Sequence, residues 1–397
     1  MRCAAADDIL RALEFARTSN LPLAVRSGGH SQAGHGSCDD GIVVDLGGMR
    51  GIEIDPARRV ARVASGARVR DVMDATQRYG LTTPMGGCPD VGVGGLTLGG
   101  GENFLMAKYG AVVDNVIGAE IITADGMLRM VSETEHPDLF WAIRGGGGNF
   151  GVVTSFSYRL YDVGDVVLAG QFTFPLSHAA ETMRAYRELM ETAPDEFSTS
   201  GGLTTVPDGP AFFIAVCYCG ERKAGERMIG AWRSALRPVE DTVKWGPYSS
   251  ELTVPPAASV GTGVFLRELN DDVIDRFAMA ISAAPLSANA VWNDFHGAVT
   301  RVPPEAMAFP LRHRGFDLFI SVPWETEQDR RQAVDWVDRL ARELRPFGRG
   351  VYVNNLNENE DNRVREAFGV NYDRLVQIKG RYDPTNVWRV NHNVAPY

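Results

Sequence analysis

Two glycine-rich segments of this 397-residue chain carry the side chains whose types and spacing could do chemistry. The first, RSGGHSQAGHG at residues 26–36, contains His30 and His35, and the second, GGCPDVGVGGLTLGGG at residues 86–101, contains Cys88. Histidine can act as a base, a ligand or a nucleophile, and cysteine as a nucleophile or a metal ligand. These side chains lie on flexible loops, and the question is which ligand or substrate they would contact.

The second segment has the composition of a phosphate cradle. Eight of its sixteen residues are glycine, and without a Cβ the backbone N–H groups can approach an anion while positive φ costs little. Apolar residues such as Val91, Val93 and Leu96 alternate with these glycines and argue against a plain surface loop. We therefore expect this segment to hold a ligand that carries phosphate.

A further glycine cluster, RGGGGNFGVVTSF at residues 144–156, leads directly into an expected strand. It is neither a Walker loop, which needs Gly-Lys-Ser/Thr, nor the nicotinamide fingerprint, which needs a strand, G-x-G-x-x-G, a helix and a distant acid. Taken alone, this cluster fits a tight turn as well as it fits a ligand contact.

A metal site and a cysteine protease explain the histidines and cysteines less well. The close pairs are His30/His35 and Cys217/Cys219, the latter inside an apolar strand pattern, and no third and fourth ligand follow them. We therefore expect no metal. A catalytic cysteine normally lies at a helix start with an orienting Asn or Asp, and not in a phosphate-type loop. Covalent attachment of a cofactor remains as the use for His30 and Cys88.

The composition predicts a soluble protein of two domains. The chain is longer than one compact domain usually is, and its 44% of hydrophobic residues can bury a large core. A net charge of −10 with scattered lysines and arginines offers no basic face, so we expect no nucleic-acid partner. No apolar run approaches the ~20 residues of a membrane span and no signal peptide is seen, which predicts a cytoplasmic location without membrane contact. Five sparse cysteines argue against a disulfide framework.

The elements that must position the glycine segments follow from periodicity. Helical spacing predicts an opening helix in residues 6–20, capped by Asp7 or Asp8, and a second helix in residues 68–80 that ends on Gly80. Strands are expected in LPLAVRS, GIVVDLG, RVARVASGA and GVVTSFSYRLYDV, and VIGAEIITADGMLRMVS is expected to form a hairpin with an Asp-Gly turn. Residues up to about 163 thus form an α+β unit.

The pattern changes from Val166 onward. Strands are expected in VVLAGQFTF, AFFIAVCYCG and GFDLFISVPW, and helices in SHAAETMRAYRELMETA and EQDRRQAVDWVDRLARELRPF, which indicates a sheet covered by helices. The tail, residues 372–397, is rich in polar and aromatic residues with little periodicity, as in a segment that wraps back onto another surface.

These segments together resemble flavoproteins of the vanillyl-alcohol-oxidase/PCMH superfamily and, within it, the berberine-bridge-enzyme-like FAD-linked oxidases. VRSGGHS resembles that family's histidine-attachment loop and CPDVGVGGLTLGGG its cysteine-attachment loop. KYGAVVDNVIGAEIITADG, HPDLFWAIRGGGGNFGVVTSFSYRL and YDPTNVWRVNHNVAP resemble its later signatures, so that the similarity spans nearly the whole chain.

The resemblance implies the fold class and the domains. It implies an α+β protein with a PCMH-type FAD-binding domain at residues 1–164 and a substrate-binding domain, an antiparallel sheet covered by helices, at residues 165–350. A C-terminal segment, residues 351–397, would return to the FAD domain. The family has some tens of residues before the opening helix, so we expect either a mis-assigned start or a shortened first layer here.

The resemblance also implies FAD as the cofactor, joined through a ring nitrogen of His30 to the flavin 8α-methyl group and through Cys88 to flavin C6. Attachment through His30 alone is the alternative. The cofactor-binding residues that it implies are Arg26, Ser27, Gly28, Gly29, His30, Ser31, Cys88, Gly92, Gly94, Gly95, Thr97, Gly99, Gly100, Asp114, Asn115, Val152, Tyr382, Asn391 and Asn393. His35 receives no role beyond a loop hydrogen bond.

The implied reaction is hydride transfer from an alcohol, a sugar or natural-product carbinol, or from a carbon beside an amine, to flavin N5. A base removes the hydroxyl proton and O2 reoxidises the flavin to give H2O2. Tyr352 is the expected base, in YVNNLNENED, where relatives carry Tyr-x-Asn-Tyr and this chain has Asn355 at the second tyrosine. A small molecule is the expected partner, and Arg312, His313 and Asp317 are expected either to contact it or to form surface salt bridges. The alternatives are a dehydrogenase with another electron acceptor and a flavin-binding protein without turnover.

Overall fold

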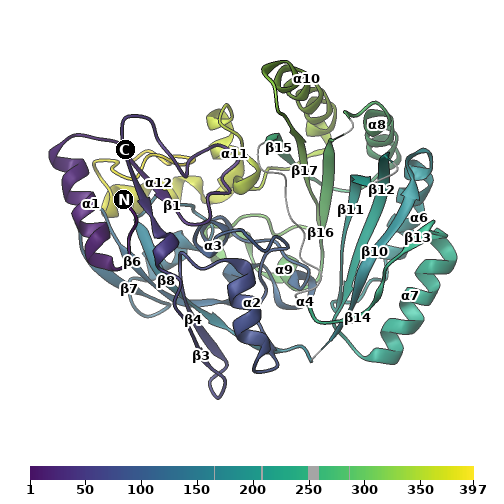
Figure 1. Ribbon diagram of the computed structural model, residues 1–397, viewed down its shortest axis with the longest axis horizontal. Helices are drawn as coiled ribbons and strands as arrows, with labels where there is room; N and C mark the ends of the chain where they lie inside the picture. The colour runs from purple at the N-terminus through teal and green to yellow at the C-terminus, as the bar shows by residue number, and fades with distance from the viewer. Residues whose placement is uncertain (165, 207–208, 249–258, 286) are drawn as a thin grey trace.

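Two sheets organise the chain, each at the centre of one lobe (Figure 1). The computed structural model describes residues 1–164, 166–206, 209–248, 259–285 and 287–397. Both termini lie in the first lobe, and the second lobe is built from the middle of the chain (Figure 1). Mixed helix and sheet, with antiparallel pairing in both large sheets, confirms the predicted α+β class.

The first lobe contains a five-stranded antiparallel sheet of strand order β3-β4-β8-β6-β7. Beside it lie a parallel pair, β1 with β2, and a short antiparallel pair, β5 with β9. Its elements before the C-terminal segment are α1 (Ala6–Thr18), β1 (Leu23–Arg26), β2 (Ile42–Asp45), β3 (Ile52–Asp55), β4 (Val60–Ala64), α2 (Val69–Gln77), β5 (Leu81–Thr82), α3 (Val93–Gly99), α4 (Met106–Tyr109), β6 (Val116–Ile122), β7 (Leu128–Val131), α5 (Pro137–Ile143), β8 (Val152–Arg159) and β9 (Tyr161–Asp162).

Most local predictions for this lobe are confirmed. The opening helix is α1, and β6 and β7 form the predicted hairpin, with Gly126 at φ 80° in its turn. The predicted cap of α1 is wrong: Ala5 is the N-cap, and Asp8 lies inside the first turn, where its carboxylate accepts hydrogen bonds from the N–H groups of Ala4 and Ala5. Part of the glycine run is helical, since Val93–Gly99 form α3.

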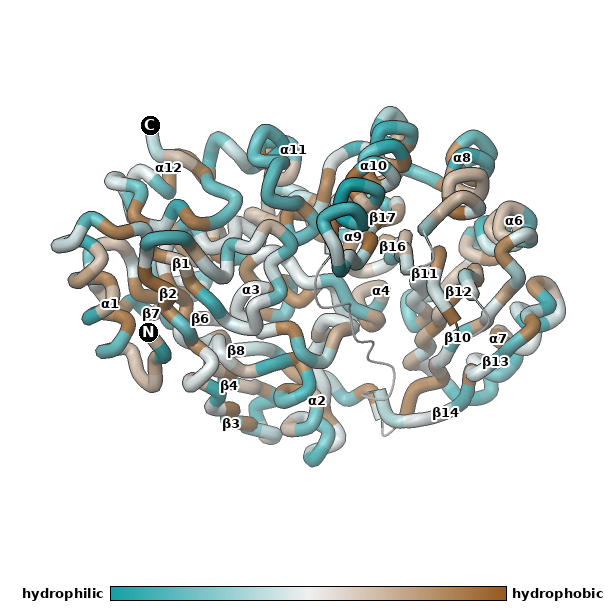
Figure 2. The backbone as a smooth tube through the Cα atoms, turned by 45° about the horizontal axis from the view of Figure 1, so that its top comes forward, coloured by the Kyte–Doolittle hydropathy of each residue, from teal (hydrophilic) through white to brown (hydrophobic). Residues whose placement is uncertain are grey.

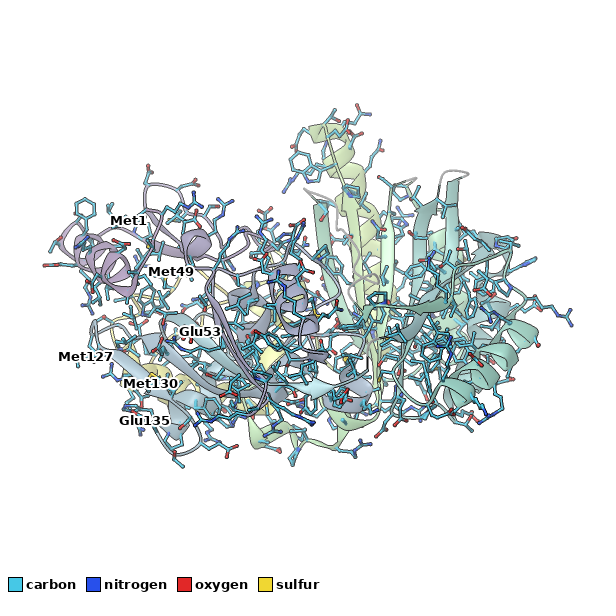
Figure 3. The ribbon with its side chains drawn as sticks, turned by 60° about the horizontal axis from the view of Figure 1, so that its bottom comes forward. Met1, Met49, Glu53, Met127, Met130 and Glu135 are labelled. Carbon is cyan, nitrogen blue, oxygen red and sulfur yellow. The ribbon has the colours of Figure 1, made fainter. Side chains whose placement is uncertain are left out.

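Strand β7 is the outer edge of this sheet. Figure 3 shows Met127, Met130 and Glu135 together on that side of the lobe, and the two methionine side chains are exposed. This edge lies away from the second lobe, so it takes no part in the site described below.

The second lobe is an eight-stranded sheet of order β13-β10-β12-β11-β16-β17-β15, with β14 also paired to β10. Its elements are β10 (Val167–Pro175), α6 (Ala179–Met190), β11 (Phe197–Val206), β12 (Gly209–Tyr218), α7 (Arg222–Leu236), β13 (Glu240–Asp241), β14 (Lys244–Gly246), β15 (Ser259–Leu266), α8 (Asp271–Ser282), β16 (Asn289–Phe295), α9 (Ala298–Arg301), β17 (Gly315–Pro323) and α10 (Glu327–Leu344). The antiparallel sheet covered by helices, as predicted, is confirmed.

Alternation along the strands gives the sheet two different apolar faces. Leu168, Phe172 and Phe174 of β10 pack with the inner faces of α6, α7, α8 and α10. Val167 and Ala169 of the same strand instead join the core of the first lobe. Helix α10 covers one of these faces. In Figure 2 this helix is mostly hydrophilic, whereas the strands beside it carry hydrophobic stretches.

The C-terminal segment returns to the first lobe, where α11 (Val364–Phe368) and α12 (Tyr372–Tyr382) lie. The tail was predicted to lack periodicity, and α12 corrects that prediction. Lys379 of α12 is fully buried, and its Nζ donates to Asp383 Oδ2 at 2.7 Å, to the Asn149 carbonyl at 2.7 Å and to the Trp388 carbonyl at 2.8 Å. One ammonium group thereby fastens the tail to the loop before β8.

A single core joins the two lobes. Met106 and Val112 of the first lobe share it with Phe265 and Phe295 of the second and with Val394 of the tail. The predicted domain boundaries stay a prediction, and residue 165, at the first of them, lies outside the described residues. In the part of the chain that the structure describes, no helix is both long and apolar enough to cross a membrane.

Candidate functional site

A cavity of about 360 Å³ lies in the first lobe, between segments that are far apart in the sequence. Residues 26–31, 86–88 and 91–96 form one part of its wall, and residues 147–153 form another. Residues 352–354 and 388–392 close it from the C-terminal segment. Both glycine-rich segments that carry His30 and Cys88 therefore face one space, as does the third glycine cluster.

The two main glycine loops touch through their backbones. A Cβ built on Gly92 would overlap the backbone nitrogen of Gly28 and the hydroxyl of Ser27, and a Cβ on Gly28 would lie 2.8 Å from Gly92 Cα. Ser27 Oγ also donates to the Ser65 carbonyl at 2.5 Å, which fastens the first loop to the end of β4. Only glycine permits this approach, so these two positions need glycine because the backbones of the two loops touch, and not because the loops must be flexible.

His30 and Cys88 both lie on the cavity wall. Partial burial lowers the pKa of His30, helped by the charge of Arg68 and opposed by Asp90, so its imidazole is neutral at pH 7. Burial raises the pKa of the Cys88 thiol. None of the five cysteines, all of them in the described part of the chain, forms a disulfide bond.

Five cavity-lining side chains carry a buried polar atom without a hydrogen-bond partner in the structure. They are Ser65 Oγ, Glu102 Oε1, Trp388 Nε1, Asn391 Oδ1 and His392 Nδ1. Unpaired buried polar atoms are costly, so a cluster of them around one cavity indicates a ligand with polar groups. FAD, with its pyrophosphate, ribityl and ring heteroatoms, fits such a lining. Ser65, Trp388 and His392 were not predicted from the sequence.

The structure brings thirteen of the predicted site residues to the cavity wall: Arg26, Ser27, Gly28, Gly29, His30, Ser31, Cys88, Gly92, Gly94, Gly95, Val152, Tyr352 and Asn391. The other seven lie outside it: Thr97, Gly99, Gly100, Asp114, Asn115, Tyr382 and Asn393.

Those seven support the wall from behind or lie farther away. The Thr97 hydroxyl is hydrogen-bonded to the Tyr158 hydroxyl at 2.6 Å, and Asn115 Nδ2 donates to the Ala111 carbonyl at 2.9 Å. A Cβ on Gly99 would overlap Asn354, and one on Gly100 would meet the Phe309 ring. Tyr382 donates from its hydroxyl to Asp138, and Asn393 Oδ1 is buried without a partner.

Asp114 forms a buried ion pair across the lobes. Arg312 Nη1 and Nη2 each lie 2.7 Å from one carboxylate oxygen of Asp114, and Arg312 is 2% exposed. Arg312 is therefore neither a substrate contact nor part of a surface salt bridge, whereas His313 is exposed. Bidentate pairing of this kind fixes the geometry between the parts that it joins.

The Tyr352 hydroxyl is buried and accepts two hydrogen bonds. Gly101 N donates to it at 2.8 Å, and Asn354 Nδ2 does so at 2.8 Å. Burial, together with the nearby carboxyl of Glu102, raises the pKa of Tyr352 well above its ordinary value. A phenol in this state keeps its proton at neutral pH, so it can donate a hydrogen bond into the site.

A pair of carboxyl groups, Glu102 and Asp317, lies beside Tyr352. Glu102 borders the cavity, and Asp317, on β17, is 1% exposed. Asn293 Nδ2 donates to Glu102 Oε2 at 2.7 Å, and Asn355 Nδ2 donates to Asp317 Oδ2 at 2.6 Å. Asp317 was predicted as a substrate contact and Glu102 was not predicted. The available signal was an acid placed directly after a glycine run.

His35, which received no role from the sequence, meets His392 at the rim of the same cavity. Their rings are T-shaped with centroids 4.6 Å apart, and Asp361 places a carboxylate within 4.8 Å of their nitrogens. Burial lowers the pKa of His392 to about 3 and also lowers that of His35. Two neutral imidazoles, one from each end of the chain, therefore border the space.

Known families match both ends of the chain. Residues 1–132 match the family described as FAD binding domain, and residues 351–395 match the family described as berberine and berberine like. The (R)-6-hydroxynicotine oxidase of Paenarthrobacter nicotinovorans is 32% identical over 425 residues, which cover 100% of this chain and 90% of that protein. The xylooligosaccharide oxidase of Thermothelomyces thermophilus is 29% identical over 410 residues, which cover 94% of this chain and 82% of that protein.

Solved structures agree with this likeness. The crystal structure of 6-hydroxy-D-nicotine oxidase from Arthrobacter nicotinovorans matches with a TM-score of 0.87 and 28% identity, covering 100% of this chain and 91% of that chain. A berberine-bridge-enzyme-like protein of Arabidopsis thaliana shares the fold with a TM-score of 0.90 at 21% identity, covering 100% and 91% of the two chains.

Proposed function

This chain belongs to the berberine-bridge-enzyme-like family of FAD-linked oxidoreductases, and we propose that it is an oxidase that takes hydride from an alcohol carbinol or from a carbon beside an amine. One observation carries the proposal: a cavity lined by both glycine loops, by His30 and Cys88, and by five side chains with an unpaired polar atom. The two relatives are named as oxidases of 6-hydroxynicotine and of xylooligosaccharides, and these names support the two donor classes.

The residues that would hold FAD follow from the lining. Backbone groups of residues 26–31 and 92–95 would contact its pyrophosphate, and Ser65, Trp388, Asn391 and His392 would pair with its polar groups. Bound FAD supplies a two-electron acceptor that takes hydride from the donor and is reoxidised by O2 to give H2O2. The chain itself would bind and orient the donor and accept the proton that the donor loses.

The test uses the purified protein with its flavin. Anaerobic mixing with glucose, xylooligosaccharides or 6-hydroxynicotine is expected to bleach the flavin absorbance with at least one of them, and air is expected to restore it with release of H2O2. Flavin that no donor bleaches would favour a binding protein without turnover. Flavin that stays reduced in air until a quinone or dye is added would favour the dehydrogenase.

Covalent attachment is a separate prediction. We expect the yellow colour to survive acid denaturation and to map by mass spectrometry to peptides containing His30 and Cys88, because both side chains border the cavity. The peptide containing Cys38, a partly buried thiol outside the cavity lining, serves as the control. Flavin on the His30 peptide alone would leave Cys88 as an unmodified thiol, and flavin released by acid would refute attachment altogether.

We propose that Tyr352 serves the site as a hydrogen-bond donor. A Tyr352→Phe substitution removes the acceptor of Gly101 N and Asn354 Nδ2 and leaves a buried donor unpaired, so we expect the free energy of unfolding to fall by about 1–3 kcal/mol. Activity should fall as well, without a shift in its pH profile. Urea unfolding measures the first effect, with Tyr79→Phe at an exposed ring as the control. An unchanged unfolding free energy would contradict this assignment.

A further inference from the structure

The Glu102–Asp317 pair joins the two lobes at the cavity wall. Glu102 follows the glycine run of the first lobe, where Gly101 N is held by the Tyr352 hydroxyl. Asp317 lies in the middle of β17, in the sheet of the second lobe. Glu102 therefore lines the cavity, and Asp317, which is 215 positions later in the sequence, lies behind it and outside the cavity lining.

The sheet register explains why Asp317 points to this place. Asn293 of β16 and Asp317 of β17 are register partners, so their side chains lie on the same face of the sheet. Asp294, the next residue of β16, lies on the opposite face and is hydrogen-bonded to His296. The face that carries Asn293 and Asp317 is the one that meets Glu102.

Unpaired oxygens of the pair favour a shared proton. Asn293 and Asn355 occupy one oxygen of each acid, and Glu102 Oε1 and Asp317 Oδ1 are buried without a hydrogen-bond partner. Each acid affects the pKa of the other, so the two side chains lie close together. Because a carboxylate is only an acceptor, one proton placed between these two oxygens would give both of them a partner.

We propose that Glu102, held by a proton shared with Asp317, accepts the proton that the donor's reacting O–H or N–H group loses. This inference rests on the proposed function. In the step, the O–H bond of an alcohol breaks and its proton passes to the Glu102 carboxylate, a C=O bond forms, and the C–H hydrogen leaves with its electron pair to the flavin, which is the oxidant. Asp317 and Asn293 are positioning residues.

The groups that face the pair set its titration. Asn293 from β16 and Asn355 from the segment after β17 are neutral, and Tyr352 is the third titratable group that faces the two acids. Burial raises the pKa of Asp317 to about 7, and burial together with the charge of Asp317 raises the pKa of Glu102 well above its ordinary value. The pair therefore loses its first proton near neutral pH, where a general base is most effective.

The first experiment compares kcat/KM for the donor that bleaches the flavin. Glu102→Gln is expected to lower kcat/KM by about 100- to 10,000-fold with unchanged flavin content, the range for loss of a general base. Asp317→Asn removes the shared proton and the repulsion, so the rise of kcat/KM through about pH 7 in the parent should move to lower pH. Asp294→Asn makes the same change on the other face of the sheet and should leave the pH profile in place.

The second readout does not depend on turnover. A raised carboxyl pKa means that the folded protein binds protons that the unfolded chain has lost, so the pair's contribution to stability is present at low pH and is lost as pH rises from about 4 through about 7. Urea unfolding should show this slope in the parent, but a smaller slope in Glu102→Gln and Asp317→Asn.

The outcomes separate the two proposals. A parent protein that binds no flavin, or whose flavin no donor bleaches, overturns the proposed function and this inference with it. A parent that turns over while Glu102→Gln keeps kcat/KM within threefold overturns this inference alone. Unchanged stability slopes in Glu102→Gln and Asp317→Asn would show that the two acids do not share a proton, and would equally overturn it.

Discussion

A Gly92→Val variant is expected to fold but to lose its flavin. A Cβ on Gly92 overlaps the backbone nitrogen of Gly28 and the Ser27 hydroxyl, and a branched side chain adds two more carbons in the same place. The two glycine loops must then separate, which breaks the Ser27 hydrogen bond to the Ser65 carbonyl and pulls apart the wall that carries His30 and Cys88. We expect flavin affinity to fall at least 100-fold, or about 2.7 kcal/mol.

The measurement is a flavin titration of the protein prepared without cofactor, followed by fluorescence, with circular dichroism to establish folding. Gly51→Ala is the matched control, because a Cβ on Gly51 meets nothing within 4 Å. A Gly92→Val protein with the parent's flavin content would mean that the contact between the loops is not needed for the cavity.

The second large effect is expected from Lys379→Met. The Lys379 side chain is fully buried, its three N–H donors are all used, and Asp383 is its charge partner. Methionine fills a similar space but leaves the Asp383 carboxylate buried without its cation, and breaking a buried pair in this way costs about 3–5 kcal/mol. Asp383 keeps only the N–H groups of Val387 and Trp388 as partners.

Urea unfolding of both proteins measures this loss, and Lys223→Met, at an exposed position of α7, should change the unfolding free energy by less than about 0.5 kcal/mol. The loss should also appear locally, as faster hydrogen exchange in residues 383–394. A Lys379→Met protein as stable as the parent would show that the tail is held by apolar packing alone.

Much of the fold could be predicted because local patterns agree with it. The hairpin of β6 and β7 has an Asp-Gly turn between two apolar strands, and α10 has apolar residues at helical spacing with Thr326 as its cap. Helix α3 could not be predicted, since the sequence VGGLTLG has little helix propensity. Contacts made only in the folded chain hold its start, where Val93 N donates to the Ala67 carbonyl and Gly94 N to the Ser65 carbonyl.

Helix α12 was missed for a related reason. Its buried face consists of Leu375, Val376 and Ile378 together with Lys379. In a sequence pattern, a lysine is normally assigned to an exposed position. The three acceptors around its ammonium group make that position a buried one: Asp383 at the end of the same helix, and the carbonyls of Asn149 and Trp388. The apparent lack of periodicity in the tail therefore came from a polar anchor within an apolar face.

The candidate site divides in the same way. The glycine loops and the positions of His30 and Cys88 could be predicted because the residues that indicate their chemistry are contiguous in the sequence. No local sequence pattern marks Ser65, Trp388 and His392 as site residues. They can be recognised only in the folded chain, where their polar atoms lie unpaired around one cavity. Glu102 likewise could not be assigned a role from the sequence, because its raised pKa depends in part on Asp317, which lies on a strand distant in the sequence.

The core shared by the lobes limits how this enzyme could be engineered. Met106 and Val112 pack in one continuous cluster with Phe265, Phe295 and Val394, so the first lobe shares this hydrophobic cluster with the second lobe and the tail, whereas the second lobe also has a cluster of its own. A chimera that joins the second-lobe sheet of a relative to residues 1–164 must carry matching residues on both sides of this shared cluster. Donor preference should therefore be exchanged by altering side chains in place, and not by swapping modules.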